Sequence, residues 1–312
     1  MDDEFQFLPA QAAEIGAAVP PVRRLRHALP DGRIVSALQY GDAATGGYPA
    51  PRVTLLHGAG LNAHTWDVTV LALGLPALAI DLPGHGDSSW RDDAAYAGPT
   101  LAADVAPAIA AWTQGPQVLV GQSLGGLTAA SVAAAFPELV RRLVVVDITP
   151  GIDPNGDAAQ LSAFFAGPTD WADRDELVER ALSFGLGGSR EAATRGVYLN
   201  SRVRDDGRVE WKHHFARLAN ALAADPAAAA EAQSRNDLVR GALSASGWDD
   251  LAATTAPTTL IVGTRGYVTP ADADEYRTRL PAATIVEAPT GHNVQEEAPA
   301  LLASLVSDIV SA

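Results

Sequence analysis

The sequence predicts an α/β protein built on one mostly parallel sheet, and two observations carry that prediction. Short apolar runs alternate with longer helix-like stretches along most of the chain, which is the pattern of strands joined by helical crossovers. Most of the runs are continuously apolar, as expected for strands that helices cover on both faces. Eight strands are predicted, at residues 23–29, 34–40, 52–56, 77–80, 117–120, 143–146, 258–262 and 284–287.

The order of these elements gives the expected layout of the sheet. The first two predicted strands flank Pro30-Asp31-Gly32-Arg33, and an Asp-Gly pair between two alternating runs is a strong hairpin signal. The later strands are separated by longer segments, which parallel neighbours require. Helices are predicted at residues 101–113, 124–136, 271–280 and 296–310.

The alternation stops near Thr149 and resumes near Trp248. The residues between them contain turn-rich stretches and amphipathic pieces, such as 173–184 and 211–223, and few strand-like runs. We therefore expect a mainly helical cap at 150–247, inserted after the sixth strand. The first part of the core is then 1–149, with an N-terminal extension at 1–21, and the second part is 248–312.

Composition excludes several classes of protein. The 312 residues carry 22 Lys and Arg against 37 Asp and Glu, a formal net charge of −15, and no basic stripe that would neutralise nucleic-acid phosphates. The absence of cysteine excludes disulfides, thiolate catalysis and sulfur-ligated metal sites. The acidic start without an apolar segment predicts a cytoplasmic protein with no membrane partner. The oligomeric state stays open.

A nucleophilic serine is predicted where the fifth strand ends. The motif there, followed by a helical pattern, is Gly121-Gln122-Ser123-Leu124-Gly125. A G-x-S-x-G motif between strand and helix holds its serine on a strained turn at the N-terminus of the helix. Ser123 is therefore the candidate nucleophile.

Two backbone amides are the candidate oxyanion donors. In such a site one N–H belongs to the residue after the nucleophile, here Leu124, and the other to the loop after the third strand, here Ala59. Gly58 and Gly60 flank Ala59 and are candidate substrate-binding positions. His57, which precedes them, is expected to be structural.

His292 is the candidate general base. It lies in Gly291-His292-Asn293, after the last predicted strand, and loops at the carboxyl ends of parallel strands converge on one site. The other histidines lack this position. His213 and His214 are adjacent and make a poor metal pair, so neither a metal site nor a cofactor is expected.

These motifs in this order resemble the α/β-hydrolase superfamily. The resemblance rests on the histidine–glycine loop, the serine motif, the late Gly-His pair and Asp81-Leu82-Pro83-Gly84-His85-Gly86-Asp87-Ser88, which the family uses as a structural turn. The segment 57–63 with Trp66 is similar to bacterial pimeloyl-carrier-protein methyl ester esterases. Asp147-Ile148-Thr149-Pro150 is similar to esterases of the abhydrolase-11 type. The resemblance implies an α/β-hydrolase fold.

The chain departs from the family pattern at the acid of the triad. Most members place it in the loop after the seventh strand, but here the expected position is Gly266. Some relatives carry the acid at the end of the sixth strand, and the resemblance then implies Asp147. Asp272 and Asp274 are the alternatives.

The sequence thus predicts a serine hydrolase, of carboxylesterase or lactonase type, that cleaves an ester or lactone of a small, largely apolar substrate. Cleavage of thioesters or C–C bonds, or a non-hydrolytic role as lyase or small-molecule receptor, are the alternatives. The cap aromatics Phe164, Phe165 and Trp171 are candidate substrate-binding residues, although such residues can equally hold a small cap together.

Overall fold

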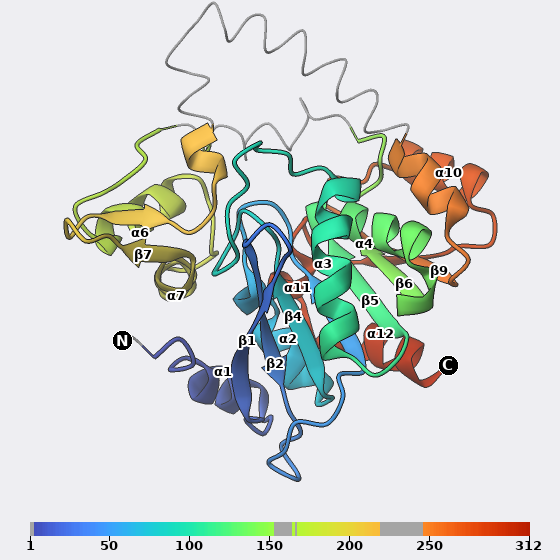
Figure 1. Ribbon diagram of the computed structural model, residues 1–312, viewed down its shortest axis with the longest axis horizontal. Coiled ribbons are helices and arrows are strands. Elements are labelled where there is room, and N and C mark those ends of the chain that lie inside the picture. The colour runs from blue at the N-terminus through green and yellow to red at the C-terminus, as the bar shows by residue number, and fades with distance from the viewer. Residues whose placement is uncertain (1–2, 153–163, 166, 219–245) are drawn as a thin grey trace, which may run out of the picture.

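The computed structural model describes residues 3–152, 164–165, 167–218 and 246–312. It confirms the predicted sheet of eight strands (Figure 1). In spatial order the strands are β1 (Val22–Ala28), β2 (Ile34–Tyr40), β4 (Ala77–Asp81), β3 (Val53–Leu56), β5 (Gln117–Gln122), β6 (Val140–Val146), β9 (Thr258–Gly263) and β10 (Thr284–Ala288). β2 is antiparallel to both β1 and β4, and the remaining pairs are parallel.

Helices cover both faces of the sheet. One layer contains α3 (Gly98–Trp112), α4 (Leu124–Ala135) and α10 (Pro270–Arg279). The other contains α2 (Asp67–Leu73), α11 (Val294–Glu297) and α12 (Pro299–Ser311). The predicted helix 296–310 is therefore two helices, and the break at Ala298 precedes Pro299, which has no N–H to continue a helix.

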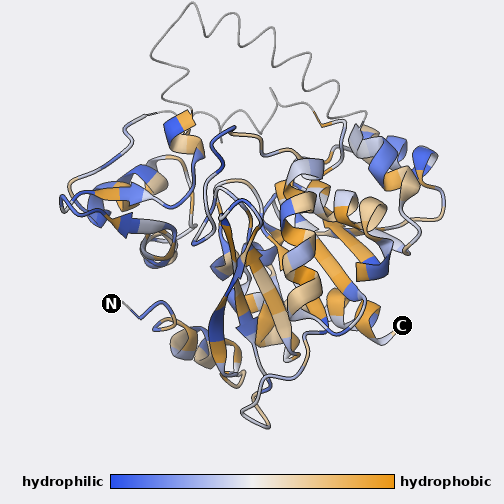
Figure 2. Cartoon of the chain, viewed as in Figure 1, coloured by the Kyte–Doolittle hydropathy of each residue, from blue (hydrophilic) through white to orange (hydrophobic). Residues whose placement is uncertain are grey.

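Alternating burial along the strands creates two apolar layers. In β5, Leu119 packs into the layer of α3 and α4, while Val118 and Val120 pack into the layer of α2 and α12. The central strands accordingly form the most hydrophobic part of the molecule (Figure 2). Because all six residues of β5 are buried, the carboxyl end of this strand is a rigid platform for the turn that follows.

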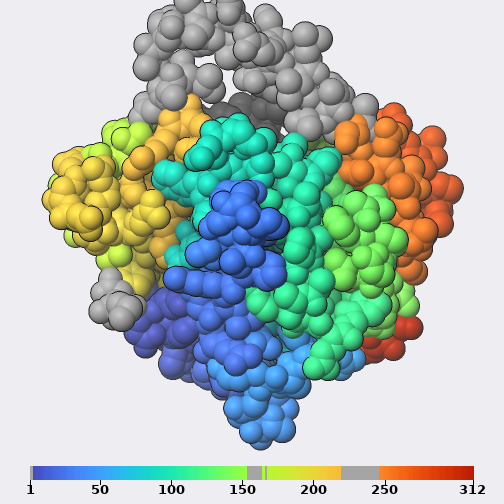
Figure 3. All heavy atoms as spheres, viewed as in Figure 1, coloured from blue at the N-terminus to red at the C-terminus, as the bar shows by residue number. Residues whose placement is uncertain are grey.

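The described residues from 164 to 218 lie beside the sheet, and we refer to them as the cap. In the space-filling view they lie at the left side of the molecule, directly against the core (Figure 3), and they have an apolar core of their own. Its helices are α6 (Arg174–Ser183) and α7 (Arg190–Asn200), and α6 begins after the predicted start at Asp173, whose carboxylate caps it. The predicted cap residues 153–163, 166 and 219–245 lie outside the described residues.

The cap also contains two short strands that the sequence pattern did not predict. β7 (Ser201–Val203) and β8 (Val209–Trp211) pair antiparallel around a turn in which Gly207 has a φ of +81°. Trp211, the first residue of the amphipathic piece 211–223, is thus the last residue of a strand, and helix begins only at Phe215. Each strand is only three residues long, too short to show an alternating pattern in sequence.

The N-terminal segment is anchored to the core by a short helix and by buried charge. α1 (Leu8–Ile15) packs on Leu71 of α2. Glu4 accepts hydrogen bonds from Arg24, which also donates to the buried Asp81 at the end of β4. None of the helices in the described ranges is long and apolar enough to cross a membrane.

Candidate functional site

The turn after β5 holds Ser123 in a strained conformation. Its φ and ψ are +54° and −122°, its N–H donates to the Val146 carbonyl at 3.0 Å, and α4 begins at the next residue. The flanking glycines make the turn possible. A Cβ on Gly121 would lie 2.1 Å from the Gly125 carbonyl oxygen, and one on Gly125 would lie 2.2 Å from that of Leu56. Backbone strain of this kind concentrates at functional sites.

Asp147 lies directly after β6, one strand away from the serine turn. It too has a positive φ, +48°, and it is fully buried. Its carboxylate accepts hydrogen bonds from the N–H groups of Gly263, at 3.0 Å, and Tyr267, at 2.7 Å. The structure brings it to His292, whose Nδ1 lies 2.8 Å from Asp147 Oδ2.

The glycine at the position of the missing acid is explained by the place of this carboxylate. A Cβ on Gly266 would lie 2.2 Å from Asp147 Oδ2 and 2.3 Å from Oδ1. Any side chain at 266 would therefore displace the Asp147 carboxylate from the backbone amides that hold it. The Asp147 carboxylate thus fills the space next to Gly266 that a side chain at this position would need.

The alternative acids have other partners. Asp272 accepts from the hydroxyl and the N–H of Thr269 and completes a capping box at the start of α10. Asp274 pairs with Arg277 at 2.6 Å on the exposed surface of the same helix. Neither contacts the His292 ring.

Two residues that the sequence did not single out hold the His292 loop in place. The Tyr267 ring stacks on the imidazole, with ring centroids 3.6 Å apart and planes 14° apart. The Gln122 side chain donates to the His292 carbonyl at 3.2 Å and to Asn293 Oδ1 at 3.3 Å, so it ties this loop to the serine turn. In the sequence, Gln122 precedes Ser123 and Tyr267 follows Gly266, and this adjacency was the signal that could have identified them. It is a weak signal, because a glutamine in a motif and a tyrosine in a loop are common.

The loop after β3 passes close to the serine. A Cβ on Gly58 would lie 3.2 Å from Ser123 Cβ and 2.2 Å from Gln122 Oε1, so only glycine allows this approach. His57 is fully buried and has two hydrogen bonds, one from the Leu82 N–H to Nε2 and one between Nδ1 and the Gly58 carbonyl. Burial lowers its pKa, so His57 is a neutral part of the scaffold.

Asp81 and the glycine turn after β4 also belong to the scaffold. The Asp81 carboxylate accepts from the N–H groups of Ala63 and Asp87, and it pairs with Arg24 at 2.7 Å. Within the part of the chain that the structure describes, no group of three or more acidic or histidine side chains is placed to hold a metal ion.

The cap reaches this site through Phe165. Its ring lies 2.5 Å from where a Cβ on Gly60 would stand, whereas Phe164 and Trp171 are buried in the cap core, each against Trp211. A side chain at position 60 would thus collide with Phe165.

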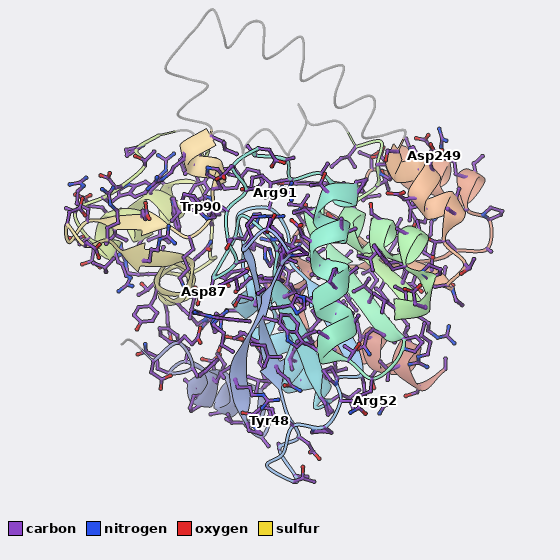
Figure 4. The ribbon with its side chains drawn as sticks, viewed as in Figure 1. Tyr48, Arg52, Asp87, Trp90, Arg91 and Asp249 are labelled. Carbon is purple, nitrogen blue, oxygen red and sulfur yellow. The ribbon has the colours of Figure 1, made fainter. Side chains whose placement is uncertain are left out.

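Polar contacts fix the cap strand end to the core. Lys212 pairs with Asp87 at 3.1 Å, and its carbonyl accepts from Trp90 Nε1 at 2.8 Å. Trp90 and Asp87 lie between the cap and the core (Figure 4). The His214 N–H donates to the Gly84 carbonyl at 2.8 Å. The residues on either side of His213 are therefore both bonded to the core.

Known proteins resemble this chain over its whole length. Esterase Rv0045c from Mycobacterium tuberculosis is 33% identical over 319 residues, which cover 99% of this chain and 96% of that protein. A solved structure of that esterase matches with a TM-score of 0.78 at 32% identity, covering 100% of this chain and 99% of the other.

Two further relatives match over about half of the chain. An sn-1-specific diacylglycerol lipase, ABHD11 from Xenopus tropicalis, is 31% identical over 181 residues, 55% of each chain. A pimeloyl-[acyl-carrier protein] methyl ester esterase from Aeromonas hydrophila is 33% identical over 153 residues, 46% of this chain and 56% of that protein. Both are of the kinds that the sequence motifs resemble. The model of the alpha/beta hydrolase family matches residues 55–305, and the chain belongs to that family.

Proposed function

We propose that the protein is a serine esterase that hydrolyses a carboxylic ester or lactone of a small, largely apolar substrate through an acyl-enzyme. The observation that carries this proposal is the 2.8 Å contact between His292 Nδ1 and the buried Asp147, beside the strained Ser123 turn. The relatives named above are esterases and a lipase, which supports ester bonds as the substrate class.

The first half of the reaction forms the acyl-enzyme. Ser123 Oγ attacks the carbonyl carbon while His292 Nε2 takes the hydroxyl proton. Asp147 accepts the hydrogen bond from Nδ1–H, which keeps the Nε2 lone pair directed outward and stabilises the imidazolium. The tetrahedral intermediate then collapses, and the alcohol leaves with the proton that His292 returns to it.

The second half repeats these roles with water. His292 takes a proton from a water molecule, whose oxygen attacks the acyl carbon. Collapse of the second tetrahedral intermediate breaks the bond to Ser123 Oγ, which regains a proton from His292. The products are the free acid and the regenerated serine. In a lactone the leaving alcohol stays attached to the acyl group, so one product with both groups is released.

The oxyanion of both intermediates is assigned to the N–H groups of Leu124 and Ala59. Leu124 is the first residue of α4, and the first amides of a helix have no carbonyl partner within the helix. The helix dipole adds positive potential at the same place. Ala59 lies between Gly58 and Gly60, in the loop that approaches Ser123 closely.

The cap residues divide into two groups in this proposal. Phe165 packs on Gly60 and is the best placed of the three candidate aromatics to contact a substrate. Phe164 and Trp171 pack with Trp211 inside the cap, and Phe164 also contacts the Phe165 ring. The apolar ring next to the oxyanion loop suits an apolar acyl or alcohol portion.

A panel of substrates with the Ser123→Ala variant tests the proposal. We expect p-nitrophenyl acetate and butyrate, or a γ-lactone, to be hydrolysed by the wild type, and kcat to fall by a factor on the order of 10⁶ in the variant. An acyl thioester in the same panel separates ester from thioester preference. Ligand binding without turnover of any member would instead support a non-hydrolytic role.

A further inference from the structure

His213 is a buried residue whose position the surrounding structure fixes. It follows β8, between Lys212 and His214, and both of these neighbours make hydrogen bonds to the core. Its ring is stacked on Trp211, with centroids 5.5 Å and planes 20° apart, and it lies 4.9 Å from the Phe165 ring. The imidazole is therefore held in place before any ligand arrives.

Neither ring nitrogen of His213 has a hydrogen-bond partner, although the residue is only 1% exposed. Burial lowers its pKa to about 3, so the ring is neutral and offers one donor and one acceptor. Most buried polar groups in native proteins are paired, and a polar group that is buried and unpaired costs stability. Such an exception calls for a ligand or a solvent molecule as the partner.

Other buried histidines of the same protein show the usual outcome. Both ring nitrogens of His57 are hydrogen-bonded, and those of His64 contact Asp67 and Glu4. His85 is intermediate, because its Nδ1 lies 3.2 Å from the Pro83 carbonyl oxygen while its Nε2 has no partner. The rings of His85 and His213 both contact Phe215, with centroids 5.1 Å and 6.5 Å from it.

A chain of ring contacts connects His213 with the proposed reaction site. Phe165, which contacts His213, packs against Gly60, the residue after the proposed oxyanion donor Ala59. Phe215 stacks on Phe165 with centroids 5.5 Å apart and contacts His85 at 5.1 Å. The polar nitrogens thus lie among aromatic rings next to the loop that approaches Ser123.

We propose that His213 is a specificity-determining residue that hydrogen-bonds an oxygen substituent of the substrate, a hydroxyl or carbonyl group apart from the scissile ester. A neutral imidazole has one ring nitrogen that donates and one that accepts. A substrate hydroxyl can therefore accept a hydrogen bond from one of the two rings, His213 or His85, and donate one to the other ring. The aromatic surroundings require the rest of that portion to be apolar. The substrate class is then a hydroxy- or oxo-substituted ester or lactone, and this inference rests on the proposed esterase function.

Matched substrate pairs test the proposal. One pair differs in the acyl group, p-nitrophenyl 3-hydroxybutyrate against p-nitrophenyl 3-methylbutyrate. The other differs in the alcohol, 2-hydroxyethyl butyrate against propyl butyrate. In His213→Phe we expect kcat/KM for the hydroxylated member of one pair to fall about tenfold, the size expected for one lost hydrogen bond, with its apolar partner unchanged. His213→Gln, which keeps a donor and an acceptor, should retain part of the preference.

A second histidine provides the matched control. His27 lies on the edge strand β1, and its ring contacts Trp112 of α3 instead of the rings around His213, so His27→Phe should leave the ratio within each pair unchanged. Equal losses for both members of each pair in His213→Phe, or unchanged ratios in both pairs, would overturn the proposal. Equal losses would mean that His213 contributes only packing. Unchanged ratios would mean that its hydrogen-bond partner is an internal water molecule.

Failure of the esterase function would be visible separately. If the wild type hydrolyses none of these esters, the same pairs are used as ligands in calorimetry. Tighter binding of a hydroxylated member by the wild type, lost in His213→Phe, would still support the role of His213. Equal binding within each pair would reject it.

Discussion

Two regions of the molecule bury polar groups in opposite ways. One is the floor of the proposed site, formed by Ser123, Asp147 and His292, and the other is the underside of the cap, formed by His213 and the aromatic rings around it. On the floor, the Asp147 carboxylate has backbone amides and an imidazole as partners. In the cap, His213 is as deeply buried and has none. The backbone differs too: Ser123 and Asp147 are two of the three non-glycine residues with positive φ in the described chain, and both belong to the floor.

In the proposed function, the floor carries out the reaction and the cap selects the substrate. On the floor, the Asp147 carboxylate has its hydrogen-bond partners without a substrate, and the Ser123 backbone is held by the Val146 carbonyl. The cap underside keeps unsatisfied hydrogen-bonding capacity among aromatic rings, which a ligand would complete. Changes to the floor should therefore alter the rate for every ester, whereas changes to the cap should alter stability or the choice of ester.

After the loss of the Ser123 hydroxyl, the largest effect on the floor is expected at Asp147. In Asp147→Asn an amide NH₂ group would face the donors of Tyr267 and His292, so the imidazole would lose its orientation. We expect kcat for all esters to fall about 10⁴-fold. The measurement is steady-state turnover of p-nitrophenyl butyrate by the purified variant.

Two exposed acids supply the control for this substitution. Asp272→Asn and Asp274→Asn change residues of α10 that pair locally, so each should retain activity within about twofold of wild type, as surface changes do. Near-normal turnover in Asp147→Asn with an inactive Asp272 or Asp274 variant would assign the acid to α10 instead.

A substitution in the cap core should mainly lower the stability of the protein. Trp171 is buried against Trp211, and Trp171→Ala should cost about 3–5 kcal/mol by leaving a cavity in the cap core. Thermal unfolding measures this loss. Because the floor makes none of these contacts, turnover of p-nitrophenyl acetate well below the melting temperature should fall much less than in Asp147→Asn. A loss as large as that one would show that the two regions are not separable.

A moderate effect on kcat is expected at Tyr267, whose ring contacts the floor. Tyr267→Ala removes the ring stacked on His292 but keeps the backbone N–H that Asp147 accepts. A misoriented imidazole should lower kcat by about 10- to 100-fold with little change in KM. Tyr267→Phe keeps the ring and should recover most of this rate. An unchanged kcat in Tyr267→Ala would limit the positioning of His292 to Asp147 and Gln122.

The smallest effect tests a partnered histidine of the core, for comparison with His213. Burial alone would lower the pKa of His64, but Asp67 and Glu4 raise it to about 9, while the charge of Arg24 acts against them. A pKa above the unfolded value of about 6.5 means that the charged ring stabilises the fold below pH 6.5, and that this contribution is lost as pH rises through 9.

The urea midpoint of the wild type should therefore fall between pH 6 and 9.5, relative to that of His64→Gln. Comparing the two proteins at each pH removes the contribution of every other titrating group. A parallel pH dependence in both would contradict the assignment of this charge to His64.

Much of the fold followed from local pattern. The Asp-Gly hairpin, the apolar strands and the serine motif depend on residues within a few positions of one another, and the structure has the predicted strands in these places. The pattern predicted neither β7 and β8, whose three-residue length leaves no periodicity, nor the helix break at Ala298.

The candidate site divides in the same way. The sequence by itself determined where Ser123 and His292 lie, because motifs at strand ends fix position along the chain, and a resemblance pointed to Asp147. Only the tertiary structure decided that Gly266 must lack a side chain, that Tyr267 stacks on His292, and that His213 is buried without a partner. These facts arise between segments far apart in sequence, where distance and burial depend on how the β-strand ends and the cap pack, and no local pattern encodes them.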